Sequence, residues 1–345
     1  MQQTSIGKMN KLIVHLVGNK NNGEGVRLSS AETDFENVEE QFTQLVNNSF
    51  NFEELYAFHF LPSVELNPVY QFVKSIFNDP SSFAEQTQNA ARILYDKSTH
   101  PKIKPGELQA AYFTNCSIDN NTVDAIAFFK SENKETFLKV LATKQGFTLE
   151  TDTGIGVKKL DKGCIIFNTK EKDGYLVAVV DNTNRGEEAQ YWKEEFLAVQ
   201  PVANEFHQTS QFLGIAKNFV TRQLDEDFEV SKADKIDLLN RSVEYFKTHE
   251  SFDKGEFERE VFQEPGIINS FRNFDNNYRQ ENEIELTDNF DISAQAVKKQ
   301  ARVFKSVLKL DKNFHIYIHG NRELIEQGVE KDGRKFYKIY FTEES

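Results

Sequence analysis

The chain has 345 residues and a formal net charge of −13, and 39% of its residues are hydrophobic, with 31 phenylalanines. Its length and apolar content suffice for one or two folded domains, and its 17 glycines and 7 prolines argue against a low-complexity or disordered chain. Its longest early apolar run, residues 12–17, is much shorter than a membrane span or a signal-peptide core, so we expect a cytoplasmic protein without a membrane partner.

Strands and helices alternate in the first hundred residues. Residues 12–17, 26–29 and 55–60 are predicted to form short strands. Apolar residues at helical spacing predict one helix from about residue 34 and another over residues 83–95.

From Leu108 the apolar pattern changes to a period of two, which is typical of strands. Strands are predicted over residues 108–117, 122–129, 147–151, 156–160, 164–168 and 175–180, with one helix near 134–141. The connections are too short for parallel crossovers, so neighbouring strands are expected to be antiparallel. Cys116 and Cys164 lie in these strands, where we expect reduced core thiols.

After Asp181 the pattern favours helices. A helix over residues 191–199 followed by Pro201 predicts a domain boundary near residue 200. Further helices are predicted over 204–224, from the capping-box pair Ser231 and Asp234 through Phe246, and over 266–280 behind Pro265.

The last fifty residues combine a basic helix with short strands. The helix is predicted from Ser293 to about Arg302, and the strands over residues 303–310, 314–319 and 335–341. The expected fold class is α+β. Residues 1–200 form a domain with a mainly antiparallel sheet plus helices, and residues 201–345 form a helical domain that ends in a small antiparallel sheet.

Positive charge is concentrated near the C-terminus of this acidic chain. Residues 298–338 contain eleven Lys and Arg against five acids, so this segment carries +6 and the rest of the chain −19. Such a distribution suits contact with a polyanion at one place, although a solvated surface gives the same pattern. The candidate nucleic-acid-binding residues are Lys298, Lys299, Arg302, Lys305, Lys309, Lys312, Arg322, Arg334, Lys335 and Lys338.

Catalytic signals are weak throughout. His315 and His319 lie on a predicted strand, where they would be about 13 Å apart at roughly 3.3 Å per residue and could not share one metal ion. The consecutive acids Asp225, Glu226 and Asp227 are expected to begin a loop and to point in different directions. We therefore predict no catalytic residue, no metal ligand and no cofactor.

Several segments resemble the bacterial nucleoid-associated protein family of the NdpA/YejK type. They are the run Tyr175–Asp181, the run Ala189–Leu197, the helix opening Phe206–Phe219, and the closing runs Phe314–Gly320 and Lys335–Phe341. The resemblance covers nearly the whole chain and implies a cytoplasmic protein that binds nucleic acid at the nucleoid without established catalytic activity.

Charge and resemblance together predict a non-enzymatic protein that binds the phosphate backbone of nucleic acid with little sequence preference. Double-stranded DNA is the expected ligand, and RNA binding and a homodimer remain open. The main alternative is an acidic adaptor that docks on a DNA-processing enzyme at the nucleoid. A third hypothesis is a metal-dependent nuclease.

Overall fold

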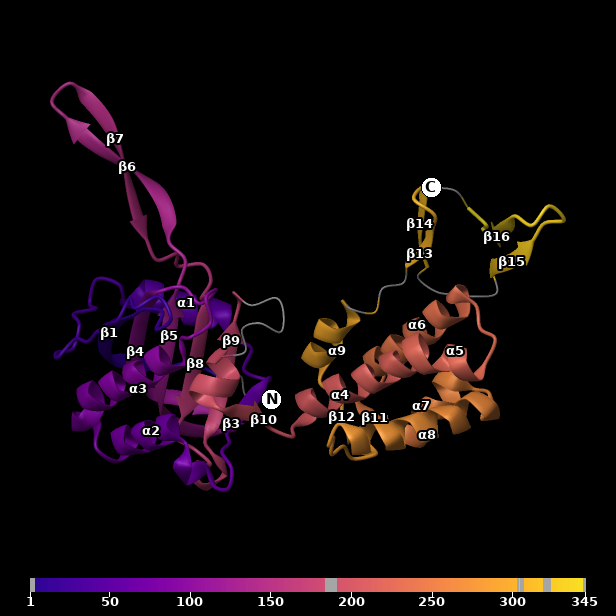
Figure 1. The fold of residues 1–345 in the computed structure, drawn as a ribbon, viewed down its shortest axis with the longest axis horizontal. Helices are drawn as coiled ribbons and strands as arrows, with labels where there is room; N and C mark the ends of the chain where they lie inside the picture. The colour runs from indigo at the N-terminus through magenta and orange to yellow at the C-terminus, as the bar shows by residue number, and fades with distance from the viewer. Residues whose placement is uncertain (1–3, 184–190, 303, 305–306, 319–323, 344–345) are drawn as a thin grey trace. The chain divides into compact units, whose positions relative to one another are not determined.

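The computed structural model describes residues 4–183, 191–302, 304, 307–318 and 324–343 (Figure 1). The chain divides into two compact units, Met1–Val202 and Ala203–Ser345, which are called the N-terminal and the C-terminal unit below.

The N-terminal unit is built on an eight-stranded antiparallel sheet with the strand order β10-β3-β9-β8-β5-β4-β1-β2. This sheet confirms the predicted antiparallel arrangement and the α+β class. Its strands are β1 (Lys8–Val17), β2 (Val26–Arg27), β3 (Leu55–Phe58), β4 (Gly106–Ile118), β5 (Asn121–Ser131), β8 (Lys162–Phe167), β9 (Leu176–Asp181) and β10 (Val199–Pro201).

Both faces of the sheet are buried. Phe128 and Phe129 are adjacent on β5 and therefore point to opposite faces, yet neither is exposed. The core on the Phe128 face includes residues of two helices and a π-helical turn, and the core on the Phe129 face includes residues of a third helix. These elements are α2 (Pro68–Asn78), α3 (Phe83–Lys97) and the turn Lys193–Leu197 on the first face, and α1 (Glu39–Ser49) on the second.

Two predictions for the N-terminal helices need correction. The helix expected from about residue 34 begins only at Glu39, because Asp34 accepts a bond from the Glu36 amide in a preceding turn. The helix expected over residues 191–199 is reduced to the π-helical turn Lys193–Leu197, and Val199 already pairs with β3.

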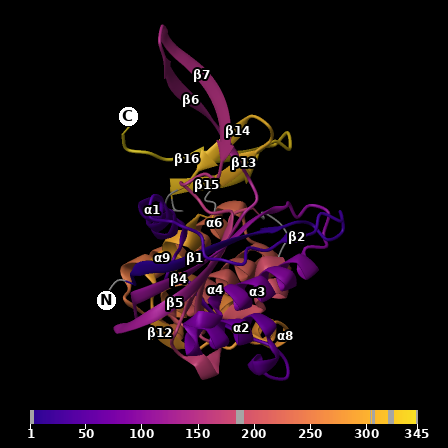
Figure 2. The same ribbon diagram turned by 90° about the vertical axis from the view of Figure 1, so that its left-hand side faces the viewer.

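A two-stranded arm, β6 (Glu135–Thr143) and β7 (Gly146–Gly154), projects from this sheet (Figures 1 and 2). The helix predicted near residues 134–141 is therefore wrong. The segment forms a hairpin because Val140 pairs with Leu149 across the strands and Gly146 takes a φ of +142° at the turn. The strand predicted over residues 156–160 is also absent, since these described residues form bends and irregular backbone.

The C-terminal unit is mainly helical and ends in two hairpins. Its elements are α4 (Glu205–Asn218), a π-helical turn (Phe219–Gln223), α5 (Leu224–Asp227), α6 (Lys232–Thr248), β11 (Ser251–Asp253), α7 (Lys254–Phe257), a second π-helical turn (Glu258–Phe262), α8 (Pro265–Glu281), β12 (Asn289–Asp291), α9 (Ala294–Ala301), β13 (Val307–Leu310), β14 (Phe314–Tyr317), β15 (Ile325–Val329) and β16 (Lys335–Ile339).

An aromatic core holds these helices together. The Phe212 ring is buried and contacts four other phenylalanines, at centroid distances from 4.2 to 6.0 Å. Such ring pairs add to the stabilisation that comes from burial of apolar area. Two predicted helix starts are confirmed, because Ser231 and Asp234 form the capping box of α6 and Pro265 is the first residue of α8.

The structure changes the expected ends of two other segments. Asp225–Asp227 belong to helix α5 and do not begin a loop, because the helix continues from α4 through the π-helical turn. The strand expected from residue 303 begins at Val307, and residues 303, 305 and 306 lie outside the described residues. Within the parts of the chain that the structure describes, none of the helices is sufficiently long and apolar to span a lipid bilayer.

Candidate nucleic-acid interface

Helix α9 places three of the predicted cations at one helix end. Ser293 caps the helix start, where its hydroxyl accepts a hydrogen bond from the Ala296 amide at 3.2 Å. Lys298 and Lys299 lie in the last turn, and Arg302 is the C-cap. All three side chains are exposed, so the end of α9 presents positive charge to solvent.

The lysines of α9 also have a structural role. Cations near the C-terminus of a helix interact favourably with the partial negative charge of its free carbonyls. Lys299 Nζ lies 5.5 Å from the centroid of the Phe206 ring, which is 5% exposed. A cation–π contact of this kind contributes about 0.5–1 kcal/mol. Lys299 therefore contributes to folding as well as to surface charge.

The β13–β14 hairpin carries two more cations. Lys309 on β13 lies opposite His315 on β14, and both side chains are exposed on the same face of the hairpin. Leu308 points to the other face and is 1% exposed, in a small core with Ile236 of α6. Lys312 is exposed in the turn between the strands.

Two of the three predicted cations on the β15–β16 hairpin form ion pairs. Arg334 pairs with Asp332 at 2.6 Å. Lys338 lies opposite Glu326 and pairs with it at 3.6 Å. Lys335 and Lys338 are separated by three positions on one strand and therefore point to opposite faces. This hairpin does not present its three cations as one surface.

The ten residues predicted to bind nucleic acid therefore do not form one surface. Lys305 and Arg322 lie outside the described residues. Among the residues that the structure describes, Lys298, Arg302, Lys309, Lys312 and Lys335 form no ion pair. We define the C-terminal basic surface as the exposed cations of α9 and of the β13–β14 hairpin, which are Lys298, Lys299, Arg302, Lys309 and Lys312.

Helix α6 supports both parts of this surface. Residues of α6 contact α9 and also β13. Phe304, between α9 and β13, is 7% exposed and belongs to the aromatic core. The two groups of cations are thus anchored to one helix by apolar contacts.

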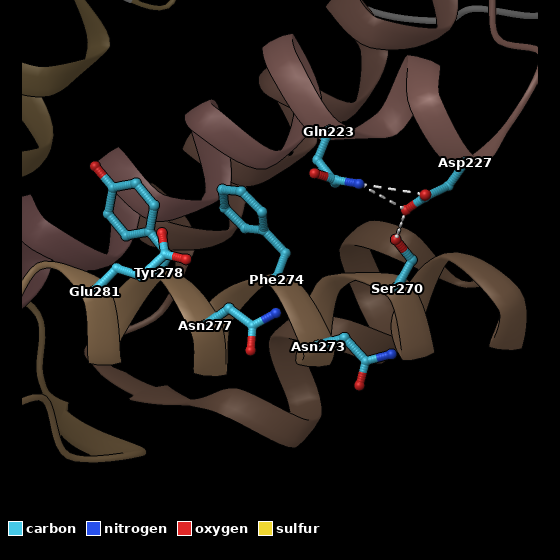
Figure 3. Close-up of a pocket in the computed structure, with 8 residues that line it drawn as sticks. All are labelled: Gln223, Asp227, Ser270, Asn273, Phe274, Asn277, Tyr278 and Glu281. Atoms are coloured by element: carbon cyan, nitrogen blue, oxygen red, sulfur yellow. Dashed lines mark hydrogen bonds between the residues drawn. The ribbon is translucent and has the colours of Figure 1, made fainter.

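The acidic side chains of α5 contact different partners. Asp225 pairs with Lys235, whereas Asp227 accepts hydrogen bonds from Gln223 at 3.3 Å and from Ser270 (Figure 3). A cavity of about 550 Å³ lies beside Asp227, and its other carboxylate, Glu281, lies at the opposite end in Figure 3. These carboxylates do not converge on one point, as a metal ion or a substrate would require.

The structure also brings together a group of side chains that the sequence analysis did not identify. His249, Glu256 and Glu260 place their nitrogen and oxygen atoms within 4.8 Å of one another. The four-residue spacing of the two glutamates could have indicated that they lie together, because residues at i and i+4 share one helix face. The contribution of a histidine seven residues earlier depends on the turn between two helices and could not be read from spacing.

Comparison with known proteins gives one family. The family model described as nucleoid-associated protein YejK matches residues 13–334 of this chain. Neither a curated protein nor a solved structure shows significant similarity to it.

Proposed function

The chain belongs to the family of the nucleoid-associated protein YejK, and on that premise we propose that it binds nucleic acid in the cytoplasm, at the bacterial nucleoid. Its principal ligand is double-stranded DNA, and RNA is the alternative ligand. The C-terminal basic surface contacts the phosphate backbone, with little preference for base sequence. The observation that carries this proposal is that four exposed cations of this surface, Lys298, Arg302, Lys309 and Lys312, form no ion pair within the described part of a chain of net charge −13.

The surrounding charge supports a local mode of binding. Residues 203–297, the helical part of the C-terminal unit, contain ten Lys and Arg against twenty Asp and Glu. This part repels a polyanion, so attraction is limited to the basic surface. Because the attraction comes from exposed charges, it weakens as salt screens them.

A charge-reversal variant tests the proposed surface. Lys298→Glu, Arg302→Glu and Lys309→Glu together leave Lys299 on Phe206 and remove three cations that have no described partner. At about 0.5 kcal/mol for each lost contact, affinity for duplex DNA should fall about tenfold or more, equally for unrelated sequences. Gel-shift titration of the pure protein measures this loss.

The matched control places the same change of charge in the N-terminal unit. Lys158→Glu, Lys159→Glu and Lys172→Glu alter three exposed side chains by the same total charge. The control variant should bind duplex DNA with an affinity within about twofold of that of the wild type at the same salt concentration, since long-range repulsion is largely screened. Equal losses in both variants would mean that net charge, and not the basic surface, governs binding.

We also propose that the protein is not an enzyme. The divergent hydrogen bonds of Asp225 and Asp227 support this, because nuclease chemistry requires convergent carboxylates. Duplex DNA or RNA incubated with the pure protein and magnesium or manganese should remain intact. Cleavage that is lost on replacement of Asp225 or Asp227 would establish the nuclease alternative.

A second candidate function, an adaptor for a DNA-processing protein, is favoured by the β6–β7 arm. One face of the arm carries no charged residue, and its apolar side chains Leu138, Val140, Phe147 and Leu149 are 63–79% exposed. An uncharged apolar surface of this kind suits a protein partner better than a polyanion. The arm thus offers a docking surface that is distinct from the basic surface.

Localisation in cells separates the two functions. If direct DNA binding holds the protein at the nucleoid, the charge-reversal variant should become diffuse and an arm variant should stay in place. The adaptor function predicts the reverse. Sedimentation of the pure protein adds a third comparison. If the wild type is a homodimer and the arm variant is a monomer, the partner of the arm is a second copy of this chain.

A further inference from the structure

Three side chains with metal-binding atoms meet where helix α6 ends. His249 is the C-cap residue of α6, Glu256 lies in α7, and Glu260 lies in the π-helical turn that continues α7. The short strand β11 returns the chain from α6 to α7 and so places the histidine beside the two glutamates. Their ligand atoms all lie within 4.8 Å of one another.

The histidine ring is held in one tautomer. Its Nδ1 lies 2.9 Å from the Tyr245 carbonyl oxygen, which can only accept a hydrogen bond. Nδ1 therefore carries a proton, and in the neutral ring the lone pair is on Nε2. Histidines that bind metals commonly have this arrangement, with the far ring nitrogen donating to a carbonyl. Nε2 is also the nitrogen nearest to Glu260, at 3.8 Å from its Oε2.

Tyr245 also orients the rest of the group. Its ring stacks on the His249 ring, with centroids 4.1 Å apart and planes inclined by 17°. Its hydroxyl lies 3.2 Å from Glu256 Oε2. Tyr245 is 3% exposed and belongs to the aromatic core, so this support is rigid. One buried residue thus positions a nitrogen ligand and an oxygen ligand together.

The spacing fits a shared ion better than a direct pair. A separation of 3.8 Å exceeds hydrogen-bond distance, so His249 and Glu260 do not stabilise each other by a hydrogen bond. Two ligands at about 2.1 Å from a tetrahedral zinc ion lie about 3.4 Å apart. Small rotations of the half-exposed Glu260 side chain suffice to reach that distance.

We propose that His249, Glu256 and Glu260 bind one divalent transition-metal ion, with zinc as the best fit. One imidazole and two carboxylates suit zinc more than magnesium or calcium, which prefer oxygen ligands alone. The three protein ligands leave a coordination position for water, because the site is open to solvent. The ion links the end of α6 to α7 and the turn after it.

Zinc binding by the full chain tests this site. The wild-type protein should bind one zinc ion more tightly than the double variant Glu256→Gln and Glu260→Gln, by at least about a hundredfold. Tyr245→Phe keeps the ring and removes only the hydroxyl, and should weaken binding by about tenfold. Competition with a chromophoric chelator measures the affinities, and circular dichroism checks that each variant is folded.

A control variant removes equal charge nearby. Glu244→Gln in α6 and Glu264→Gln at the N-cap of α8 change two exposed glutamates that lie close in the chain to the proposed ligands without replacing one of them. This control should bind zinc as the wild type does. Equal weakening in the control would reduce the site to general attraction of cations by acidic residues, and wild-type affinity in the Glu256 and Glu260 variant would overturn the proposal.

Cobalt identifies the ligands directly. The visible spectrum of the cobalt-loaded protein should show nitrogen and oxygen ligation that is lost in His249→Gln. Cys116 and Cys164 are both buried. A thiolate charge-transfer band would nevertheless place the ion at a cysteine and would contradict the assignment.

Discussion

His15 shows how burial fixes the protonation state of one residue. The side chain lies on β1 and is 1% exposed. Its Nδ1 accepts a hydrogen bond from the Ser29 amide at 3.1 Å, and its Nε2 lies 3.2 Å from Thr87 Oγ1. Burial, with the nearby positive charge of Arg92, lowers the pKa of His15 from 6.5 to about 4. The folded chain therefore keeps this imidazole neutral.

Acidification should destabilise the N-terminal unit through His15. Because its pKa is lowered on folding, the unfolded chain takes up a proton as pH falls below 6.5, and the folded chain does so only near pH 4. The contribution of His15 to the free energy of unfolding, up to about 3 kcal/mol, is therefore present above pH 6.5 and is lost as the pH falls to about 4. Denaturant unfolding at pH 7 and pH 4.5 measures the loss.

Two histidine variants isolate this effect from the protonation of carboxylates. His15→Gln should be less stable at pH 7 but lose less between pH 7 and 4.5 than the wild type. His59→Gln changes an exposed histidine in the same unit and should keep the wild-type pH dependence. An unchanged pH dependence in His15→Gln would show that folding does not lower the pKa of His15.

Residue patterns predicted which side chains carry charge but not what they contact. The sequence placed Lys298 and Lys299 on one helix end, which the structure confirms. It gave no sign that Lys299 lies on Phe206, because that contact joins α9 to α4. His249 was missed for the same reason, since its neighbours are set by tertiary packing.

At the scale of elements, the β6–β7 arm is where sequence patterns misled most. Phe137, Val140 and Leu141 recur at helical spacing, but Thr136, Leu138, Val140 and Ala142 also alternate as in a strand. The hairpin turn and the cross-strand pairs decide between the two patterns. The strands of the main sheet were easier to predict, because their apolar pattern of period two is bounded by short polar turns.

The exposed face of the arm gives a second prediction. Replacing Leu138, Val140, Phe147 and Leu149 together with threonine keeps strand-forming residues and removes apolar area that nothing in the described structure covers. Thermal stability should change little, within about 0.5 kcal/mol for each exposed site. Binding of a hydrophobic dye should decrease.

One result for the threonine variant would contradict this prediction. A large drop in melting temperature would show that this face is buried in solution, by another part of the chain or by a second copy. Replacement of Thr148 and Glu150 on the opposite face with serine and glutamine is the matched control, and neither measurement should change.

At the scale of the whole molecule, each of the two units has its own core. The N-terminal unit encloses a sheet between helices, and the C-terminal unit packs its helices around phenylalanines. The fold class followed from the sequence because apolar periodicity and loop length depend on local residues. The sequence also placed the basic segment on a helix followed by strands, which the structure confirms, but it did not predict the ion pairs of Arg334 and Lys338, because a sum of charges carries no geometry.

The salt dependence of DNA binding tests the central claim most directly. If the five cations of the C-terminal basic surface each release one counterion, log K should fall against log salt with a slope of about −4 to −5. The variant Lys298→Glu, Arg302→Glu and Lys309→Glu should reduce that slope to about −2. A wild-type slope near zero, or an unchanged slope in the folded variant, would contradict binding through this surface.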